Sequence, residues 1–379
     1  MPGLLMGLLQ YGWLAVNAFF AGILLCAPFE QGPGTVAHMA VATIWTIAAA
    51  FMGIKGIKYV ARVATYLPLI PLVILVILVV KTISGVGSFN PQALIDAGKE
   101  LKGADGKVVT ALAPLSSFGV IAVIMTYIVG FFATAGAAGT DIASSNRDKK
   151  DVQLGGLVGI AGATIFAGGA ALLIVAGAYG AGMVKSGGVT QASSLMGIIM
   201  GEKVAPVFWY LLAIAAFPPA CFSSLIAANS FRTTLPKVNP LISCGLGTIV
   251  AIILAVTGLA GKAIDVFTVI GASFGPICGA MVADYLLSGG KWAGPRAGFN
   301  PAGWVSWAVG FAVGAVEFIA KIPGLEMLAG KIPAPPVAAF VVGFVLYLVL
   351  AKIGMQSKTL EMPGAAPAPA PAGGPSQPA

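Results

Sequence analysis

The stretch GFFATAGAAGTDIASSNRDKKD, residues 130–151, carries the end of an apolar run into a short charged loop. Its middle, Gly136 to Gly139, has almost no side chains. A helix this rich in glycine and alanine can stop and restart at membrane depth, because its backbone can approach groups that satisfy the freed amides and carbonyls. Freed carbonyls and half-helix ends can then hold a small polar ligand. We therefore expect a broken membrane-spanning helix with the other helices packed around it.

The composition indicates a polytopic membrane protein. Of 379 residues, 58% are hydrophobic and 9% are charged, and the mean hydropathy is +0.96. A soluble domain with a water-facing surface does not sustain such values. We predict an all-α fold in which a transporter domain, residues 1–358, precedes a disordered Pro/Ala-rich tail, residues 359–379. The ten predicted spans are residues 4–26, 36–54, 63–83, 117–142, 153–180, 205–231, 241–260, 265–288, 302–321 and 334–352.

The loop charges predict the orientation of the bundle. The loops after spans two, four, six and eight, with the tail, carry twelve cations against five acids, whereas the opposite loops carry nine cations against eight acids. By the positive-inside rule, the cation-rich side and both termini are cytoplasmic. We expect a multi-pass protein of the plasma membrane whose surroundings are the lipid bilayer, and the charges give no reason to expect nucleic acid.

The first span carries three polar or aromatic residues on one helical face. Gln10, Trp13 and Asn17 are spaced i, i+3, i+7. Two amides and an indole can stack on and hydrogen-bond a flat heteroaromatic ring. The alternative is an interfacial tryptophan with amide bonds between helices, but Trp13 lies deeper than interface tryptophans usually do.

The broken fourth span offers an aromatic face beside exposed backbone. Phe131 and Phe132 directly follow Gly130. Packing alone also explains phenylalanines in an apolar span. Asp141, at the inner end of this span, is predicted to cap the following turn or to pair with Arg147.

The sixth span contains a second expected break. Pro218 and Pro219 lack amide hydrogens, so the helix should bend there. The hydroxyls of Ser223 and Ser224 and the carbonyl of Ala220 could then bind a hard cation such as sodium. Alternatively, each hydroxyl bonds back to the carbonyl four residues earlier. Asn229 lies on a different face and could reach a ligand separately.

Other polar features favour structural roles. Asp284 is interpreted as an interface or gating residue, whereas His38 and Glu317 are expected near outer ends as surface or snorkelled groups. We expect no cofactor or metal beyond a possible sodium ion, and without a nucleophile–base pair or phosphate loop we do not predict an enzyme. The eighth span should be interrupted midway by Gly271, Gly275, Pro276 and Gly279.

Four of these segments, in order, resemble the nucleobase:cation symporter-1 family, which transports cytosine, purines, uracil, allantoin and related compounds. They are the Gln-x-Gly-Trp segment at Gln10, the Phe-Ala-Thr segment ending at Asp141, the Ser-Ser-x4-Asn segment at Ser223, and Phe-Gly-Pro…Ala-Asp-Tyr around Asp284. The resemblance implies a LeuT-like inverted-repeat fold, with this chain beginning at the family's third helix and lacking the first two.

The resemblance also implies roles for individual residues. Trp13 matches an indole that stacks on the substrate, and Asn17 and Asn229 match amide-bearing positions. Phe131 or Phe132 occupies the place of a second stacking aromatic. Gly130 would offer backbone to the ligand's edge, and the residues implied for a sodium site are Ala220, Ser223 and Ser224.

The leading interpretation is a permease that imports a nucleobase or related planar heterocycle together with sodium or protons. Two alternatives are an inverted-repeat carrier for amino acids or other small solutes, and a truncated remnant or assembly partner that does not transport. The substrate, the coupling ion and the oligomeric state are not given by the sequence.

Overall fold

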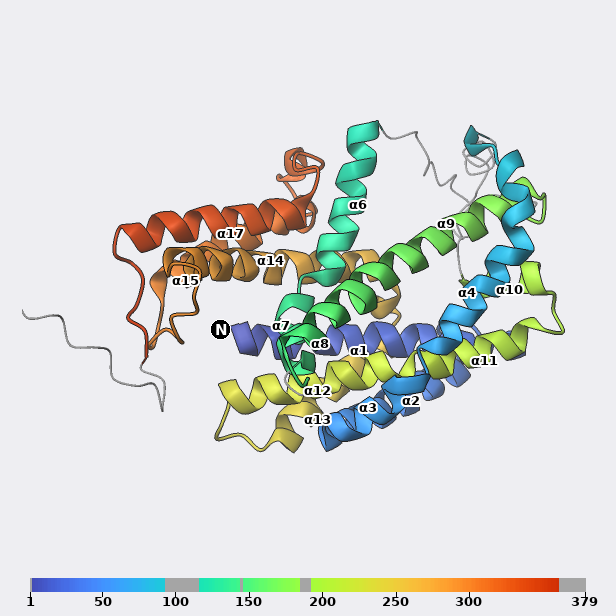
Figure 1. The fold of residues 1–379 in the computed structure, drawn as a ribbon, viewed down its shortest axis with the longest axis horizontal. Coiled ribbons are helices and arrows are strands. Elements are labelled where there is room, and N and C mark those ends of the chain that lie inside the picture. The colour runs from blue at the N-terminus through green and yellow to red at the C-terminus, as the bar shows by residue number, and fades with distance from the viewer. Residues whose placement is uncertain (1, 93–115, 144–145, 185–191, 361–379) are drawn as a thin grey trace, which may run out of the picture. The chain divides into compact units, whose positions relative to one another are not determined.

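The computed structural model describes residues 2–92, 116–143, 146–184 and 192–360. All of the predicted tail except Thr359 and Leu360 lies outside these residues, as does most of the polar loop between the third and fourth spans. The described chain is almost entirely helical, and its only bridge between extended residues joins Arg296 to Thr359. The fold is therefore all-α, as the hydropathy pattern predicts (Figure 1).

The chain is divided into two compact units, Met1–Ile270 and Gly271–Ala379. Helix α14 (Ala263–Leu287) runs through this division. The helices of the first unit are α1 (Pro2–Cys26), η1 (Ala27–Phe29), α2 (Val36–Lys55), α3 (Ile57–Tyr66), α4 (Leu69–Thr82), η2 (Ile83–Ser88), α6 (Ser117–Phe132), α7 (Ala135–Ala143), α8 (Lys149–Leu154), the π-helical η3 (Gly155–Gly162), α9 (Ala163–Gly180), α10 (Ala192–Met200), α11 (Ala205–Ala215), α12 (Phe217–Thr234), α13 (Pro240–Val256) and η4 (Leu259–Gly261).

Eight helical segments of the described chain are long and apolar enough to cross a membrane. They are Pro2–Phe29, Val36–Lys55, Ile57–Ser88, Ser117–Ala143, Lys149–Gly180, Ala205–Thr234, Asp265–Leu287 and Pro335–Lys352. Two further predicted spans correspond to shorter helices. The apolar α13 has 17 residues, and the range 302–321 holds α15 (Pro301–Gly314) and the short α16 (Val316–Ile319).

Small side chains hold α1, α2, α12 and α13 together as the core of the first unit. Ala42, Ala49, Ala220 and Ala251 are completely buried. Gly53 of α2 lies so close to α12 that a β-carbon on it would be 2.5 Å from the Cys221 carbonyl oxygen. Lipid tails are as apolar as leucine, so close contact between small residues is what favours helix association in a membrane.

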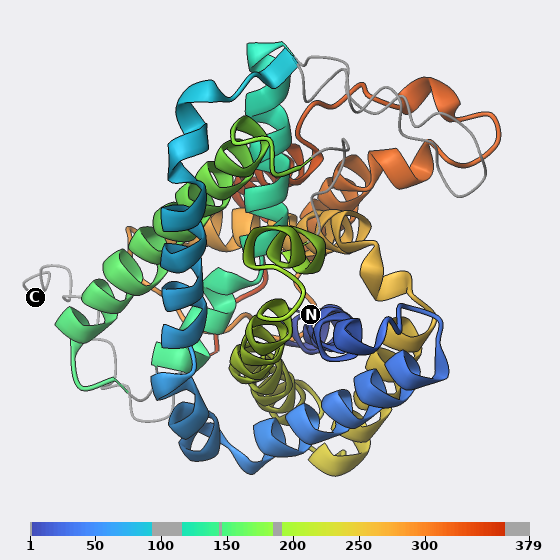
Figure 2. The same cartoon turned by 90° about the vertical axis from the view of Figure 1, so that its right-hand side faces the viewer.

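A second packing group joins α4 and α9, which are in contact and cross each other in the view of Figure 2. At its end, Gly85 of η2 faces α9, where a β-carbon on Gly85 would be 2.1 Å from the Gly177 carbonyl oxygen. Only glycine allows this approach. The group includes the buried Ile74 and Ile174.

The structure corrects the sequence interpretation of His38. This side chain is fully buried, and its Nε2 lies 3.1 Å from the Phe19 carbonyl oxygen. A carbonyl can only accept, so Nε2 carries the proton and the imidazole ties α2 to α1. The interface also needs Gly22, because a β-carbon there would be 3.0 Å from Nε2. The local polarity of the sequence did not reveal this contact between helices.

In the second unit, the C-terminal part of α14 packs with α15 and α17 (Pro335–Lys352). The predicted interruption at Pro276 is wrong, because α14 continues through it. The glycines there allow close packing. A β-carbon on Gly279 would be 2.2 Å from the Phe340 carbonyl oxygen, and one on Gly343 would be 2.4 Å from the Pro276 carbonyl oxygen.

Asp284 is the centre of a polar cluster in the second unit. Its Oδ1 accepts hydrogen bonds from the Arg296 guanidinium, the Gln356 amide and, at 3.1 Å, the Tyr347 hydroxyl. The Arg296 and Asp284 side chains are only 19% and 20% exposed. This cluster gives Asp284 a definite structural role, and its predicted gating role stays a prediction.

The chain after α17 returns to the loop between α14 and α15. The amide of Ala297 donates to the Lys358 carbonyl at 2.8 Å, and the amide of Leu360 donates to the Pro295 carbonyl at 2.8 Å. Residues 355–360 are therefore bonded to the second unit by backbone as well as side chains.

Candidate functional site

Two helix breaks in the first unit border one cavity. The fourth span stops at Phe132 and resumes at Ala135, and the sixth span is interrupted at Ala216, two residues before Pro218. Among the described residues, both breaks contribute to the lining of a cavity of about 820 Å³. This volume is in the range of small-molecule sites.

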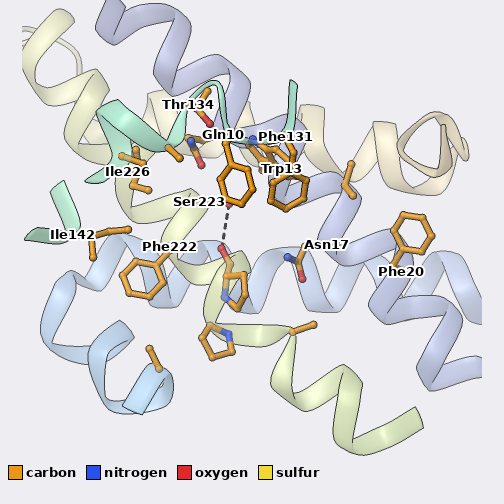
Figure 3. Close-up of a pocket in the computed structure, with 18 of the residues that line it drawn as sticks. Gln10, Trp13, Asn17, Phe20, Phe131, Thr134, Ile142, Phe222, Ser223 and Ile226 are labelled. Carbon is orange, nitrogen blue, oxygen red and sulfur yellow. Dashed lines mark hydrogen bonds between the residues drawn. The ribbon is translucent and has the colours of Figure 1, made fainter. Parts of the chain in front are cut away.

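The walls of this cavity are mostly apolar, with polar side chains at Gln10, Asn17, Thr134 and Ser223 (Figure 3). None of the described residues that line it is Asp, Glu, Lys, Arg or His. The remaining lining residues are Trp13, Val16, Phe20, Ala21, Leu24, Ala64, Pro68, Phe131, Phe132, Ala135, Ala138, Ile142, Ala216, Pro218, Pro219, Phe222, Ile226 and Phe267.

Four aromatic rings meet at one wall. The Trp13 indole is stacked on Phe267, with centroids 4.9 Å apart and 28° between planes, and meets the edge of Phe131 at 4.7 Å. Phe131 also touches Phe132 at 4.9 Å. The structure thus brings together the three predicted aromatic residues.

The space between Trp13 and Phe131 is closed in this conformation. A ring sandwiched between two aromatic planes needs about 7 Å between their centroids, twice an ordinary stacking distance. Phe131 is 43% exposed, so it is the ring with most freedom to move. Phe267 was missed by the sequence interpretation, because a phenylalanine in an apolar span carries no distinguishing signal.

Two amides of α1 face different surroundings at the cavity. Gln10 is 4% exposed, and its Nε2 lies 3.9 Å from the Met6 sulfur, which is a weak acceptor. The Oδ1 of Asn17 is buried without a hydrogen-bond partner among the described residues. A buried carbonyl without a donor is costly, so a ligand N–H at this position would be stabilised.

The three residues predicted to hold a cation are placed differently. Ser223 lines the cavity and donates from Oγ to the Pro219 carbonyl at 3.2 Å, the back-bonding alternative that the sequence left open. Ala220 is fully buried, and Ser224 is buried with no partner for its Oγ among the described residues. Ser224 lies against α2, because a β-carbon placed on Gly53 of that helix would be 2.6 Å from the β-carbon of Ser224.

Asn229 and Gly130 do not line the cavity. The Asn229 amide donates to Oδ1 of Asp141 at 3.0 Å, which links α12 to α7. Arg147, the suggested partner of Asp141, forms an ion pair with Asp151, in which its Nε donates a hydrogen bond to Oδ2 at 2.8 Å. Gly130 packs on α14, since a β-carbon there would be 2.8 Å from the Phe267 carbonyl oxygen.

Comparisons with known proteins agree with this architecture. No protein-family model and no curated protein matches the chain. A solved structure, the inward-facing conformation of Mhp1, matches with a TM-score of 0.54 and 16% sequence identity, covering 94% of this chain and 76% of that one. The chain has a LeuT-like transporter fold.

This fold relationship confirms the predicted fold class and agrees with the prediction that the chain is not an enzyme. Mhp1 is a nucleobase:cation symporter-1 member. At 16% identity the match establishes the fold of this chain, so its membership of that family, and its start at the family's third helix, stay predictions.

Proposed function

We propose that the chain is a secondary active transporter of the nucleobase:cation symporter-1 family that imports a nucleobase or related planar heterocycle. The cavity carries this proposal. It lies at two broken helices, and its lining combines a cluster of one indole and three phenyl rings with a few amide and hydroxyl groups. Such a lining suits a flat, neutral, polar-edged ring.

Recognition of the ring would use both kinds of group. Stacking on Trp13 supplies affinity, since base–aromatic stacking is worth about 1–3 kcal/mol per base. The unpaired Oδ1 of Asn17 and the Gln10 amide supply directional bonds to the ring's edge. Because Phe131 packs edge-to-face against the indole, it would turn away as the substrate enters.

An amino acid, the alternative substrate, is less well suited to this lining. Its ammonium and carboxylate groups would be desolvated in a cavity whose described lining residues carry no charge. A neutral heterocycle avoids that cost.

Coupling to sodium or protons would use the sixth span. The unpaired Oγ of Ser224, together with Ser223 and the Ala220 carbonyl, fits a hard cation that prefers neutral oxygens. Binding there would bias the equilibrium between outward-open and inward-open states. Asn229 would reach the substrate only by exchanging its bond to Asp141. We place the transporter in the plasma membrane with both termini in the cytoplasm.

Uptake by reconstituted vesicles tests the proposal. Radiolabelled cytosine, uracil, hypoxanthine and allantoin are offered with and without a sodium or proton gradient. We expect gradient-dependent uptake of at least one compound. Trp13→Ala should raise its half-saturation concentration about tenfold, as loss of one stacking contact predicts.

Trp292→Ala is the matched control, because Trp292 is 67% exposed and lies outside the cavity. Equal half-saturation for the two variants would contradict the stacking assignment. Uptake of amino acids but of no heterocycle would contradict the substrate class.

A further inference from the structure

Helix α3 has two sharply different faces. Val60 is fully buried, and Ile57 packs beside it against the core of the first unit. On the opposite face, Lys58, Tyr59 and Arg62 are exposed. Lys58 and Arg62 are four residues apart, so their side chains lie on the same side of the helix.

A third cation lies directly before this helix. Lys55 ends α2 and is separated from α3 only by Gly56, whose φ of 105° lets the chain turn there. The Nζ of Lys55 lies 5.0 Å from the ring centroid of Phe51, which is 59% exposed. We call Lys55, Lys58 and Arg62 the α3 basic surface.

Nothing in the described chain neutralises the α3 basic surface. Within the sequence, no Asp or Glu occurs from Gln31 to Ile95. Among the described residues, Arg147 pairs with Asp151 and Arg296 pairs with Asp284, and no ion pair involves the three cations of this surface.

The surroundings of the surface are those of a membrane boundary. Apolar α2 precedes it and apolar α4 follows it, and both belong to segments able to span a bilayer. Tyr66, at the end of α3, is 73% exposed, and Leu69, at the start of α4, is 57% exposed. Exposed tyrosines beside lysine and arginine are typical of the headgroup level, with apolar side chains next to acyl chains.

We propose that the α3 basic surface binds the headgroup of an anionic phospholipid. Three unpaired cations match a phosphodiester and a negatively charged membrane surface. Exposed Phe51 and Leu69 can contact the acyl chains. A free phosphate would use only the cations, whereas the apolar flanks favour a lipid.

Lipid binding to the full-length chain tests this proposal. The purified protein, in a neutral detergent, is titrated with dioleoylphosphatidylglycerol or dioleoylphosphatidylcholine, and bound lipid is counted by native mass spectrometry. The test variant is K55Q/K58Q/R62Q. Because each cation near an anionic surface contributes about fivefold in affinity, the variant should bind phosphatidylglycerol at least tenfold more weakly.

The matched control is K149Q/K150Q/K237Q, which removes three exposed cations elsewhere in the first unit. We expect this control to bind phosphatidylglycerol with an affinity within twofold of that of the parent protein. The K55R/K58R variant, which keeps the positive charges, should also retain binding. Equal loss in test and control variants would overturn the proposal, as would parent-like affinity of K55Q/K58Q/R62Q. Displacement of the lipid by equimolar glycerol 3-phosphate would overturn it in favour of a phosphate site.

Discussion

Substitution of Gly53 by alanine should force α2 and α12 apart. The new β-carbon would lie 2.5 Å from the Cys221 carbonyl oxygen, 2.6 Å from the Ser224 β-carbon and 2.8 Å from the Leu225 amide nitrogen. Ordinary contact begins at 3.4 Å, so the closest pair must separate by 3.4 − 2.5, or about 0.9 Å. Two of these three atoms are backbone, so no side-chain rotation relieves the contact.

The expected cost of this overpacking is about 1–3 kcal/mol. Alanine also has a higher helix propensity than glycine, by about 1 kcal/mol, which partly hides the cost. Gly245→Ala separates the two effects, because Gly245 also lies inside a helix but a β-carbon there meets nothing within 4 Å. The difference between the two variants isolates the overpacking term.

Thermal unfolding in detergent, followed by tryptophan fluorescence, measures this difference. Gly53→Ala should unfold at a clearly lower temperature than Gly245→Ala. The shift of α12 should also change uptake, because that helix carries Ser223 and other residues of the cavity wall. If both variants unfold at the same temperature, the close contact of α2 with α12 does not support the core as we argue.

Three further perturbations test other contacts. Asn229→Ala should destabilise the protein by about 0.5–1.5 kcal/mol, and a double-mutant cycle with Asp141→Ala, which removes the acceptor, should show that the two effects are not additive. His38→Phe should lower the free energy of unfolding by about 1–3 kcal/mol, because the Phe19 carbonyl loses its hydrogen-bond donor. An unchanged midpoint of thermal unfolding would contradict the assigned bond. Asp284→Asn should cost about 3 kcal/mol, since it leaves the mostly buried Arg296 guanidinium without a carboxylate, and parent-like stability would show that the cluster's other bonds suffice.

The break in the sixth span was predictable because its cause is local, since Pro218 and Pro219 remove amide hydrogens close to the interruption at Ala216. For the fourth span the sequence predicted a break but misplaced it, because the helix is interrupted at Ala133 and Thr134, whereas the glycine-rich residues from Gly136 to Gly139 are helical within α7. The same reasoning failed at Pro276. There the proline and its neighbouring glycines serve packing within a continuous helix, which depends on α15 and α17.

Partners across helices were harder to predict. Trp13 and Phe131 were expected together, but the stacking of Phe267 on Trp13 depends on a helix more than 200 residues away in the chain. His38 shows the same limit. A lone histidine near a helix start is ordinarily exposed, and only the approach of Gly22 in α1 makes a buried site for it.

The segment that follows α17 bears on where this protein can be cut or labelled. A fluorescent reporter joined after Leu360 would leave the bonds to Pro295 and Ala297 in place. Shortening the chain to Lys352 would instead remove Gln356 and expose the pair of Asp284 with Arg296 to water. The folded body of the second unit thus extends at least eight residues past α17, and a hydropathy plot alone would set its boundary too early.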